Sequence, residues 1–441
     1  MKKFLSFIFI LIIIPFISIH TYAASQPNLN ISSKASILID GQTGQVIYEQ
    51  NPNLRLYPAS TTKIITAVLG IENGNMNQLM TASKAAVNEI GINGSNIGLA
   101  SGETAPLEDI LNSMLIKSAN DCANIIAENI SPSRHDFIDL MNTRATELGA
   151  TNTTFTNTCG LDKSDGHPNH MTTVSDMSKI ARYAMTLPKF REIVVKQKYT
   201  MPDTNKHPST YWPKDYIGTT NKFLLGFNKY KSDEFNYTGI KTGYTNLAGC
   251  NIIASAKNTD GMELIAVVYG AKEQETLYSD TKRLFEYGFN SYSVKTLVTA
   301  DDIATKVSVS NSQEPETTLD VKYEETYKTV LPNDYDQSNL TKNLIIRKDL
   351  SAPMSQGELV GRVEFFKDDL LLGKVNLIAA SSVAAASPAI ILLPKSAAGL
   401  INSNNIAFGA ILILLFVFCY KYFLKKVPHK SQCKKRKPSE N

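Results

Sequence analysis

Three short strings, in a fixed order along the chain, carry the residue types that acyl transfer through a covalent serine ester requires. They are Ser60-Thr61-Thr62-Lys63, Ser118-Ala119-Asn120 and Lys241-Thr242-Gly243. Together they supply a nucleophilic hydroxyl, an amine beside it, a polar second wall and a cation for the substrate. Because the intervals between the strings fit one domain, we predict a single active site built from all three.

The first string pairs a nucleophile with a base. Ser60 precedes an apolar helical stretch, so it lies in the positive field of a helix start. Lys63 follows one turn later on the same face. An ammonium cannot accept a proton, but a buried lysine near a second cation loses its proton more easily, and Lys241 would be that cation. We therefore expect a neutral Lys63 to take the Ser60 proton.

The other two strings are expected to hold the substrate. Ser118 would relay a proton toward the leaving amine, and Asn120 would hold a substrate amide. Lys241 and Thr242 would lie on an edge strand that flanks the cleft and would bind a carboxylate of the substrate.

Backbone groups would complete the site. Gly243 has no Cβ, so the backbone can approach closely there. The backbone N–H groups of Ser60 and Tyr244 would form an oxyanion hole. Each string alone is weak: Ser and Asn are common helix caps, and Ser-x-x-Lys also occurs at Ser279 and Ser431. The ordered set of three is what predicts the site.

The composition describes a folded body between two basic ends. Of 441 residues, 43% are hydrophobic and 20% charged, which fits a globular protein and not a disordered one. The chain carries +4 in all, but the tail from residue 421 carries +7 and the leader +2, which leaves the body near −5. An acidic body gives no basis for nucleic-acid binding.

The two ends predict export and anchoring. Residues 1–23 have the basic start, apolar core and small-residue end of a signal peptide; an uncleaved anchor is the alternative. After a linker at 380–405, the apolar run 406–424 is long enough for a transmembrane helix, and the basic tail 425–441 would stay on the cytoplasmic side. We therefore expect a single-pass cell-membrane protein with its body outside the cell. Of its five cysteines, Cys122, Cys159 and Cys250 would lie outside, too few for a disulfide scaffold, although one bridge stays open.

The residue pattern predicts an α+β domain at 24–292 followed by a small all-β domain at 293–379. Alternating residues around a turn at 37–48 indicate a hairpin, and two apolar runs joined through 258–261 indicate paired central strands. Apolar spacings of three and four predict helices at 107–130, 136–148, 171–185 and 280–289. We therefore expect an antiparallel sheet flanked by helices.

With these strings in context, the chain resembles the serine D-alanyl-D-alanine carboxypeptidases, the low-molecular-mass penicillin-binding proteins of peptidase S11 type. The resemblance covers about residues 32–380 and includes Tyr57 to Lys63, Leu115 to Asp121, Gly160 to Asp162 and Gly239 to Thr245. It implies a β-lactamase/transpeptidase-like catalytic domain, an acyl-enzyme on Ser60, and removal of the terminal D-alanine from peptidoglycan pentapeptides. It also implies covalent inhibition by β-lactams and no cofactor or metal.

Two positions depart from the family's pattern. Cys159 stands where the family usually has a histidine, and Leu277 stands where an arginine usually reaches the terminal carboxylate. Lys241 and Thr242 would then hold the carboxylate without that arginine, or Lys272 would substitute for it. We expect weakened carboxypeptidase turnover with acylation retained.

The sequence is also compatible with three other functions. A β-lactamase shares the strings, but no Glu-x-x-Leu-Asn string lies between the second and the third. A zinc hydrolase would use His167 and His170 with Cys159 or Asp165, in a stretch that is typical of a solvated loop. A catalytically weak or non-enzymatic cell-wall binding protein would fit the two departures.

Overall fold

The computed structural model describes residues 27–386 apart from 92–93, 163–168, 213–216, 315–316 and 368–369. The expected signal peptide, transmembrane helix and cytoplasmic tail, and all but the first residues of the expected linker, lie outside the described residues. Within the described part of the chain, no helix is both long and apolar enough to cross a membrane.

A five-stranded antiparallel sheet forms the centre of the first domain, in the order β2-β1-β9-β8-β7. Its strands are β1 Ala35–Asp40, β2 Val46–Gln50, β7 Phe235–Thr245, β8 Gly249–Asn258 and β9 Glu263–Ala271. The predicted hairpin is β1 with β2, and the predicted central pair is β8 with β9. Lys241 pairs with Ile253 of β8, so the third string lies on the edge strand, as expected.

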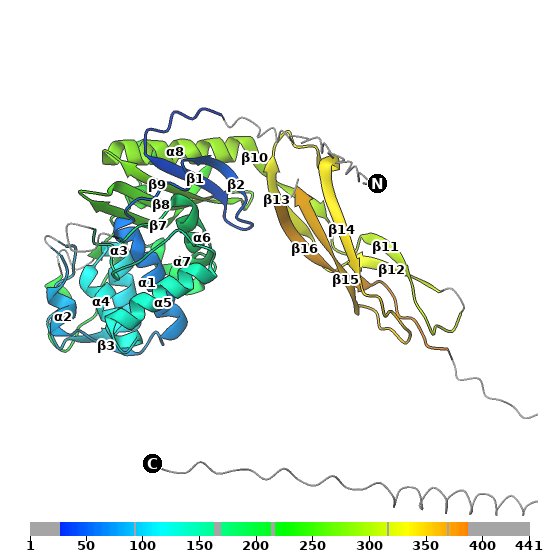
Figure 1. Cartoon of the computed structure of the whole chain (residues 1–441), viewed down its shortest axis with the longest axis horizontal. Helices are drawn as coiled ribbons and strands as arrows, with labels where there is room; N and C mark the ends of the chain where they lie inside the picture. The colour runs from blue at the N-terminus through cyan, green and yellow to red at the C-terminus, as the bar shows by residue number, and fades with distance from the viewer. Residues whose placement is uncertain are drawn as a thin grey trace, which may run out of the picture.

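Helices cover both faces of this sheet (Figure 1). They are α1 Lys63–Asn73, α2 Lys84–Asn88, α3 Leu107–Lys117, α4 Asn120–Ile130, α5 Arg134–Glu147, α6 Val174–Ala184, α7 Pro188–Val194 and α8 Gln274–Ser291. Alternate strand residues serve the two faces: Ile265 and Val267 pack with the helical layer below, whereas Leu264 packs with α8 above. Because both faces are covered, β8 and β9 are almost entirely buried.

One expected helix is two helices in the structure. We predicted a continuous helix over 107–130, but α3 ends at Lys117 and α4 begins at Asn120. Ser118 has a φ of 69°, in the left-handed region, which no α-helix continues through. The apolar spacing is the same on both sides of the break, so periodicity did not reveal it. The break places the second string at a turn between the helices.

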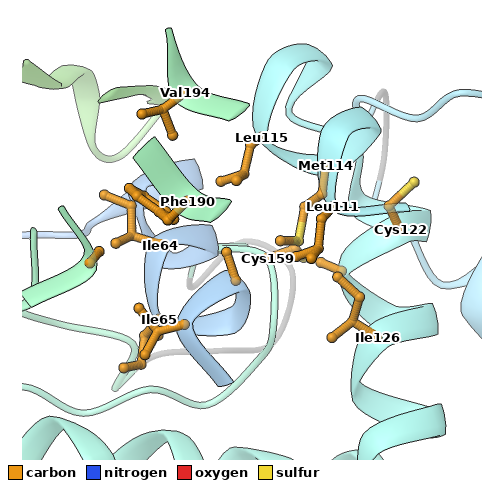
Figure 2. Close-up of a cluster of buried hydrophobic side chains, with 14 of the residues drawn as sticks. Ile64, Ile65, Leu111, Met114, Leu115, Cys122, Ile126, Cys159, Phe190 and Val194 are labelled. Carbon is orange, nitrogen blue, oxygen red and sulfur yellow. The ribbon is translucent and has the colours of Figure 1, made fainter. Parts of the chain in front are cut away.

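An apolar cluster packs between the helices that carry or flank the first two strings (Figure 2). It joins α1, α3, α4 and α7 through Ile64, Leu111, Met114, Ile126 and Phe190. All five side chains are buried, so the start of α1 is fixed against the end of α3 by packing on both sides.

Residues 292–386 form an all-β module beside the first domain (Figure 1). Strand β10 follows α8 directly and pairs with β13, a pair that we did not predict; the other five strands form a sheet in the order β11-β12-β16-β15-β14. The strands are β10 Tyr292–Val298, β11 Ile303–Ser308, β12 Thr318–Tyr323, β13 Tyr327–Pro332, β14 Leu340–Ile346, β15 Leu359–Lys367 and β16 Leu370–Ala379. Val383 and Ala385, which we assigned to the linker, form β-bridges with the module.

Candidate active site

Ser60 lies in a short 3₁₀ helix, Ala59–Thr62, that leads into α1. The side-chain nitrogen Nζ of Lys63 is 2.9 Å from Ser60 Oγ, which is hydrogen-bonding distance. The same nitrogen donates to the backbone carbonyl oxygen of Cys159 at 2.7 Å. The two side chains of the first string therefore face each other, as their spacing predicted, and a third segment holds the amine in place.

Burial makes the Lys63 amine easy to deprotonate. Its side chain is fully buried, and this burial lowers the pKa of Lys63 to about 8, although the nearby Cys159, Asp121 and Cys122 oppose the shift. Burial first, and the charge of Lys63 second, hold the pKa of Lys241 well below its usual range. We expected Lys241 to shift Lys63, but desolvation is the main cause for both amines.

Ser118 and Asn120 form the wall opposite the nucleophile, at the turn between α3 and α4. Both line the same cleft as Ser60. Asn120 is held at two points: its Nδ2 donates to the carbonyl of Ile90 at 2.7 Å, and its backbone N–H donates to the carbonyl of Ser95 at 2.6 Å. The amide is thereby oriented before any substrate binds.

The edge strand β7 forms the other wall. Thr242, Gly243 and Tyr244 line the cleft, whereas Lys241 is 1% exposed and donates to the Thr242 carbonyl at 2.9 Å. A Cβ on Gly243 would lie 3.0 Å from the backbone nitrogen of Ser60, tighter than most real contacts. The close approach of strand and nucleophile that we expected at Gly243 is therefore present, and it brings the backbone of β7 to the Ser60 N–H.

The loop that contains Cys159 and the stretch Gly160 to Asp162 completes the site, through a residue that we did not predict. The Asn157 Oδ1 accepts backbone N–H groups from Cys159, Gly160 and Leu161, and this fixes the carbonyl that binds Lys63. Thr220 was also missed; its Oγ1 is 2.7 Å from Thr242 Oγ1. Neither residue belongs to one of the three strings, so only the Asn-x-x-Gly spacing, typical of a turn, could have drawn attention to Asn157.

Gly160→Ala is expected to disrupt this site, because an added Cβ would lie 1.8 Å from the carbonyl oxygen of Ala59, beside the nucleophile. The backbone of Gly160 also has a φ of +96°, which costs an alanine about 1 kcal/mol or more. We expect at least a roughly tenfold slower reaction of Ser60 with an acylating reagent, or a lowered melting temperature. The matched control is Gly261→Ala, where φ is +86° but nothing lies within 4 Å of an added Cβ. Equal behaviour of the two variants would contradict this account.

The walls enclose a cleft of about 700 Å³. Leu277 and Tyr278 of α8 line one part of it, whereas Lys272 is not among the described lining residues. A compensating role of Lys272 therefore has no support in the geometry. Cys122, Cys159 and Cys250 are buried and form no disulfide, so the bridge that we left open is absent among them.

The described residues provide no support for the alternative of a zinc hydrolase. We expected the histidines of this stretch to be solvated, but His170 is completely buried. Its Nε2 lies 2.8 Å from Thr62 Oγ1, and its Nδ1 accepts a hydrogen bond from the backbone N–H of Thr156. The ring thus connects the side chain of Thr62, two residues after the nucleophile, to the backbone of the loop at Thr156. No group of three potential ligands occurs in the described part of the chain, and His167 and Asp165 lie outside it.

A serine hydroxyl beside a buried amine, between a polar turn and an edge strand of an α+β domain, defines a serine enzyme that works through an acyl intermediate. Residues 20–273 match the model of the peptidase S11 family, D-alanyl-D-alanine carboxypeptidase, and residues 292–385 match that of the penicillin-binding protein 5 C-terminal domain. The chain belongs to the peptidase S11 D-alanyl-D-alanine carboxypeptidase family. This confirms the resemblance that the three strings predicted.

The chain is similar to curated relatives and to solved structures over most of its length. The D-alanyl-D-alanine carboxypeptidase DacF of Bacillus subtilis is 29% identical to this chain, in an alignment that covers 78% of this chain and 83% of DacF. The D-alanyl-D-alanine carboxypeptidase DacC of Escherichia coli is 28% identical, in an alignment that covers 76% of this chain and 80% of DacC. The structure of penicillin binding protein 5 from Haemophilus influenzae superposes with a TM-score of 0.63 at 25% identity, covering 82% of this chain and 99% of its own. The two-part architecture, a catalytic α+β domain followed by an all-β domain, is thereby confirmed.

Proposed function

We propose that this chain is a serine D,D-carboxypeptidase that removes the terminal D-alanine from peptidoglycan stem peptides ending in D-Ala-D-Ala. β-Lactams would acylate the same serine. The observation that carries the proposal is the 2.9 Å separation of Ser60 Oγ and Lys63 Nζ, in a cleft shared with Ser118 and Thr242. The family membership and the names of the relatives support the choice of substrate.

In the first step, neutral Lys63 takes the Ser60 proton while Oγ attacks the carbonyl carbon of the penultimate D-alanine. The carbonyl oxygen becomes an oxyanion, which the backbone N–H groups of Ser60 and Tyr244 stabilise. As the C–N bond breaks, Lys63 passes this proton through Ser118 to the leaving amine, and D-alanine departs. Water then attacks the ester while neutral Lys63 accepts a proton from it, and this proton returns to Ser60 Oγ as the ester C–O bond breaks.

We also propose that the enzyme is exported and anchored in the membrane. Signal peptide 1–23 would direct export, helix 406–424 would anchor the chain, and basic tail 425–441 would remain in the cytoplasm. The sequence pattern supports this arrangement, and a substrate in the cell wall requires the catalytic domain on the outer side. Protease treatment of intact cells tests it, because an external body is digested and an internal one is protected.

The function is tested by treating the purified protein with benzylpenicillin and, separately, with a peptide ending in D-Ala-D-Ala. We expect a mass increase of one penicillin on the peptide that contains Ser60, and release of free D-alanine. A penicillin adduct without D-alanine release would favour the second candidate, a weak penicillin-binding protein of the cell wall, which the apolar Leu277 in the cleft supports. Rapid turnover of nitrocefin would instead indicate a β-lactamase, and no adduct at all would refute a serine acyl-enzyme.

A further inference from the structure

The leaving group of the proposed reaction carries a free carboxylate, and a protein normally recognises a carboxylate with a cation and hydrogen-bond donors. The two lysines of the strings are poorly placed for this task. Lys63 is 0% exposed and Lys241 is 1% exposed, and neither is among the residues that line the cleft. The Lys63 amine donates a hydrogen bond to the carbonyl of Cys159, and the Lys241 amine donates one to the carbonyl of Thr242.

Lys117 is the cation that does line the cleft. It is the last residue of α3, immediately before Ser118, and it is exposed. Among the described lining residues, no other lysine and no arginine occurs. Within the described residues no ion pair joins Lys117 to a carboxylate, so its charge is available to a ligand. The Ser95 Oγ donates to its carbonyl oxygen at 2.9 Å and fixes the backbone of this wall.

The backbone places Lys117 beside the hydroxyl pair on the other wall. Thr220 donates its backbone N–H to the carbonyl of Ile116 at 3.2 Å, and its Oγ1 lies 2.7 Å from Thr242 Oγ1. The end of α3, Thr220 and β7 are therefore consecutive neighbours around the cleft. Leu277 and Tyr278 continue the lining there without a charge.

We propose that Lys117 determines specificity by pairing with the C-terminal carboxylate of the substrate, while one hydroxyl of the hydrogen-bonded pair Thr220 and Thr242 donates to the same group. The inference rests on the proposed function and names the substrate class more closely: peptides with a free C-terminal acid, in preference to the same peptides with a neutral end. It assigns to an exposed lysine the role that we first gave to Lys241.

The test compares one peptide ending in D-Ala-D-Ala as the free acid and as the C-terminal amide, on four full-length proteins: wild type, Lys117→Met, Lys117→Arg and Lys222→Met. Lys222 is the matched control, because its Nζ lies 5.9 Å from the ring centre of Tyr278 but it does not line the cleft. We expect wild type to prefer the acid. Lys117→Met should lower the acid-to-amide ratio of kcat/KM by about 10- to 100-fold, mainly through KM, since a charged hydrogen bond is lost.

Lys117→Arg should keep most of the preference, and Lys222→Met should keep all of it. A fall in activity that is equal for acid and amide would overturn the inference while leaving the proposed function intact. A loss of preference in Lys222→Met and not in Lys117→Met would also overturn it. If wild type forms the penicillin adduct but cleaves neither peptide, releasing no D-alanine from the acid and no D-alaninamide from the amide, the proposed function fails and the inference fails with it.

Discussion

Ser60→Ala is expected to abolish covalent labelling by penicillin and to reduce D-alanine release by about 10⁴-fold or more, because the variant has no hydroxyl beside Lys63 to form the ester. A fluorescent penicillin measured on a denaturing gel reports the first loss, and an assay of free D-alanine reports the second. The substitution removes one oxygen from a half-buried residue, so the fold should persist.

The chain contains its own control for this result. Ser279 begins a second Ser-x-x-Lys string with Lys282, but it is exposed on α8 and does not line the cleft. Ser279→Ala should label like wild type. Undiminished labelling of Ser60→Ala would place the nucleophile elsewhere and would contradict the active site described above.

Lys63→Arg is expected to slow penicillin acylation by about 10²- to 10⁴-fold, the usual contribution of a general base. Arginine keeps the positive charge but does not lose its proton, so it cannot accept one from Ser60. Lys282→Arg, in the second Ser-x-x-Lys string, should have no effect. Since a guanidinium could disturb a fully buried site, Lys63→Met provides an uncharged variant that also lacks a base, and a thermal melt of each shows that the fold is retained.

The wild-type acylation rate should depend on pH in the direction that this base requires. Lys63 has a pKa of about 8, so its amine gains a proton as the pH falls below that value and can no longer act as a base. We expect the rate to rise with pH up to about 8 and then to level off, with a roughly hundredfold lower rate two units below the pKa. Stopped-flow acylation between pH 6 and pH 10 measures this curve. A rate that is constant or that falls over this range would exclude Lys63 as the proton acceptor.

Much of the catalytic domain could be read from short stretches of sequence. The hairpin β1–β2 and the pair β8–β9 were predictable because alternation, apolar runs and turn residues are local signals. The pairing of Ser60 with Lys63 was predictable for the same reason, since three residues along a helix set the distance between two side chains. The order of the three strings then sufficed to suggest the reaction and the family.

The tertiary structure decided what depends on segments far apart in the sequence. The depth at which Lys63 is buried, and hence its lowered pKa, comes from packing around α1. The carbonyl that holds its amine in place belongs to Cys159, 96 residues away. The turn at Ser118 and the partnership of Thr220 with Thr242 likewise arise where α3, α4 and β7 meet, and no local pattern encodes such a meeting. The sequence by itself therefore determined which groups are available for the reaction. The fold decided which of them are buried and which, like Lys117, are exposed in the cleft. The reason is that burial depends on the neighbours that pack around a residue and not on the residue's own type.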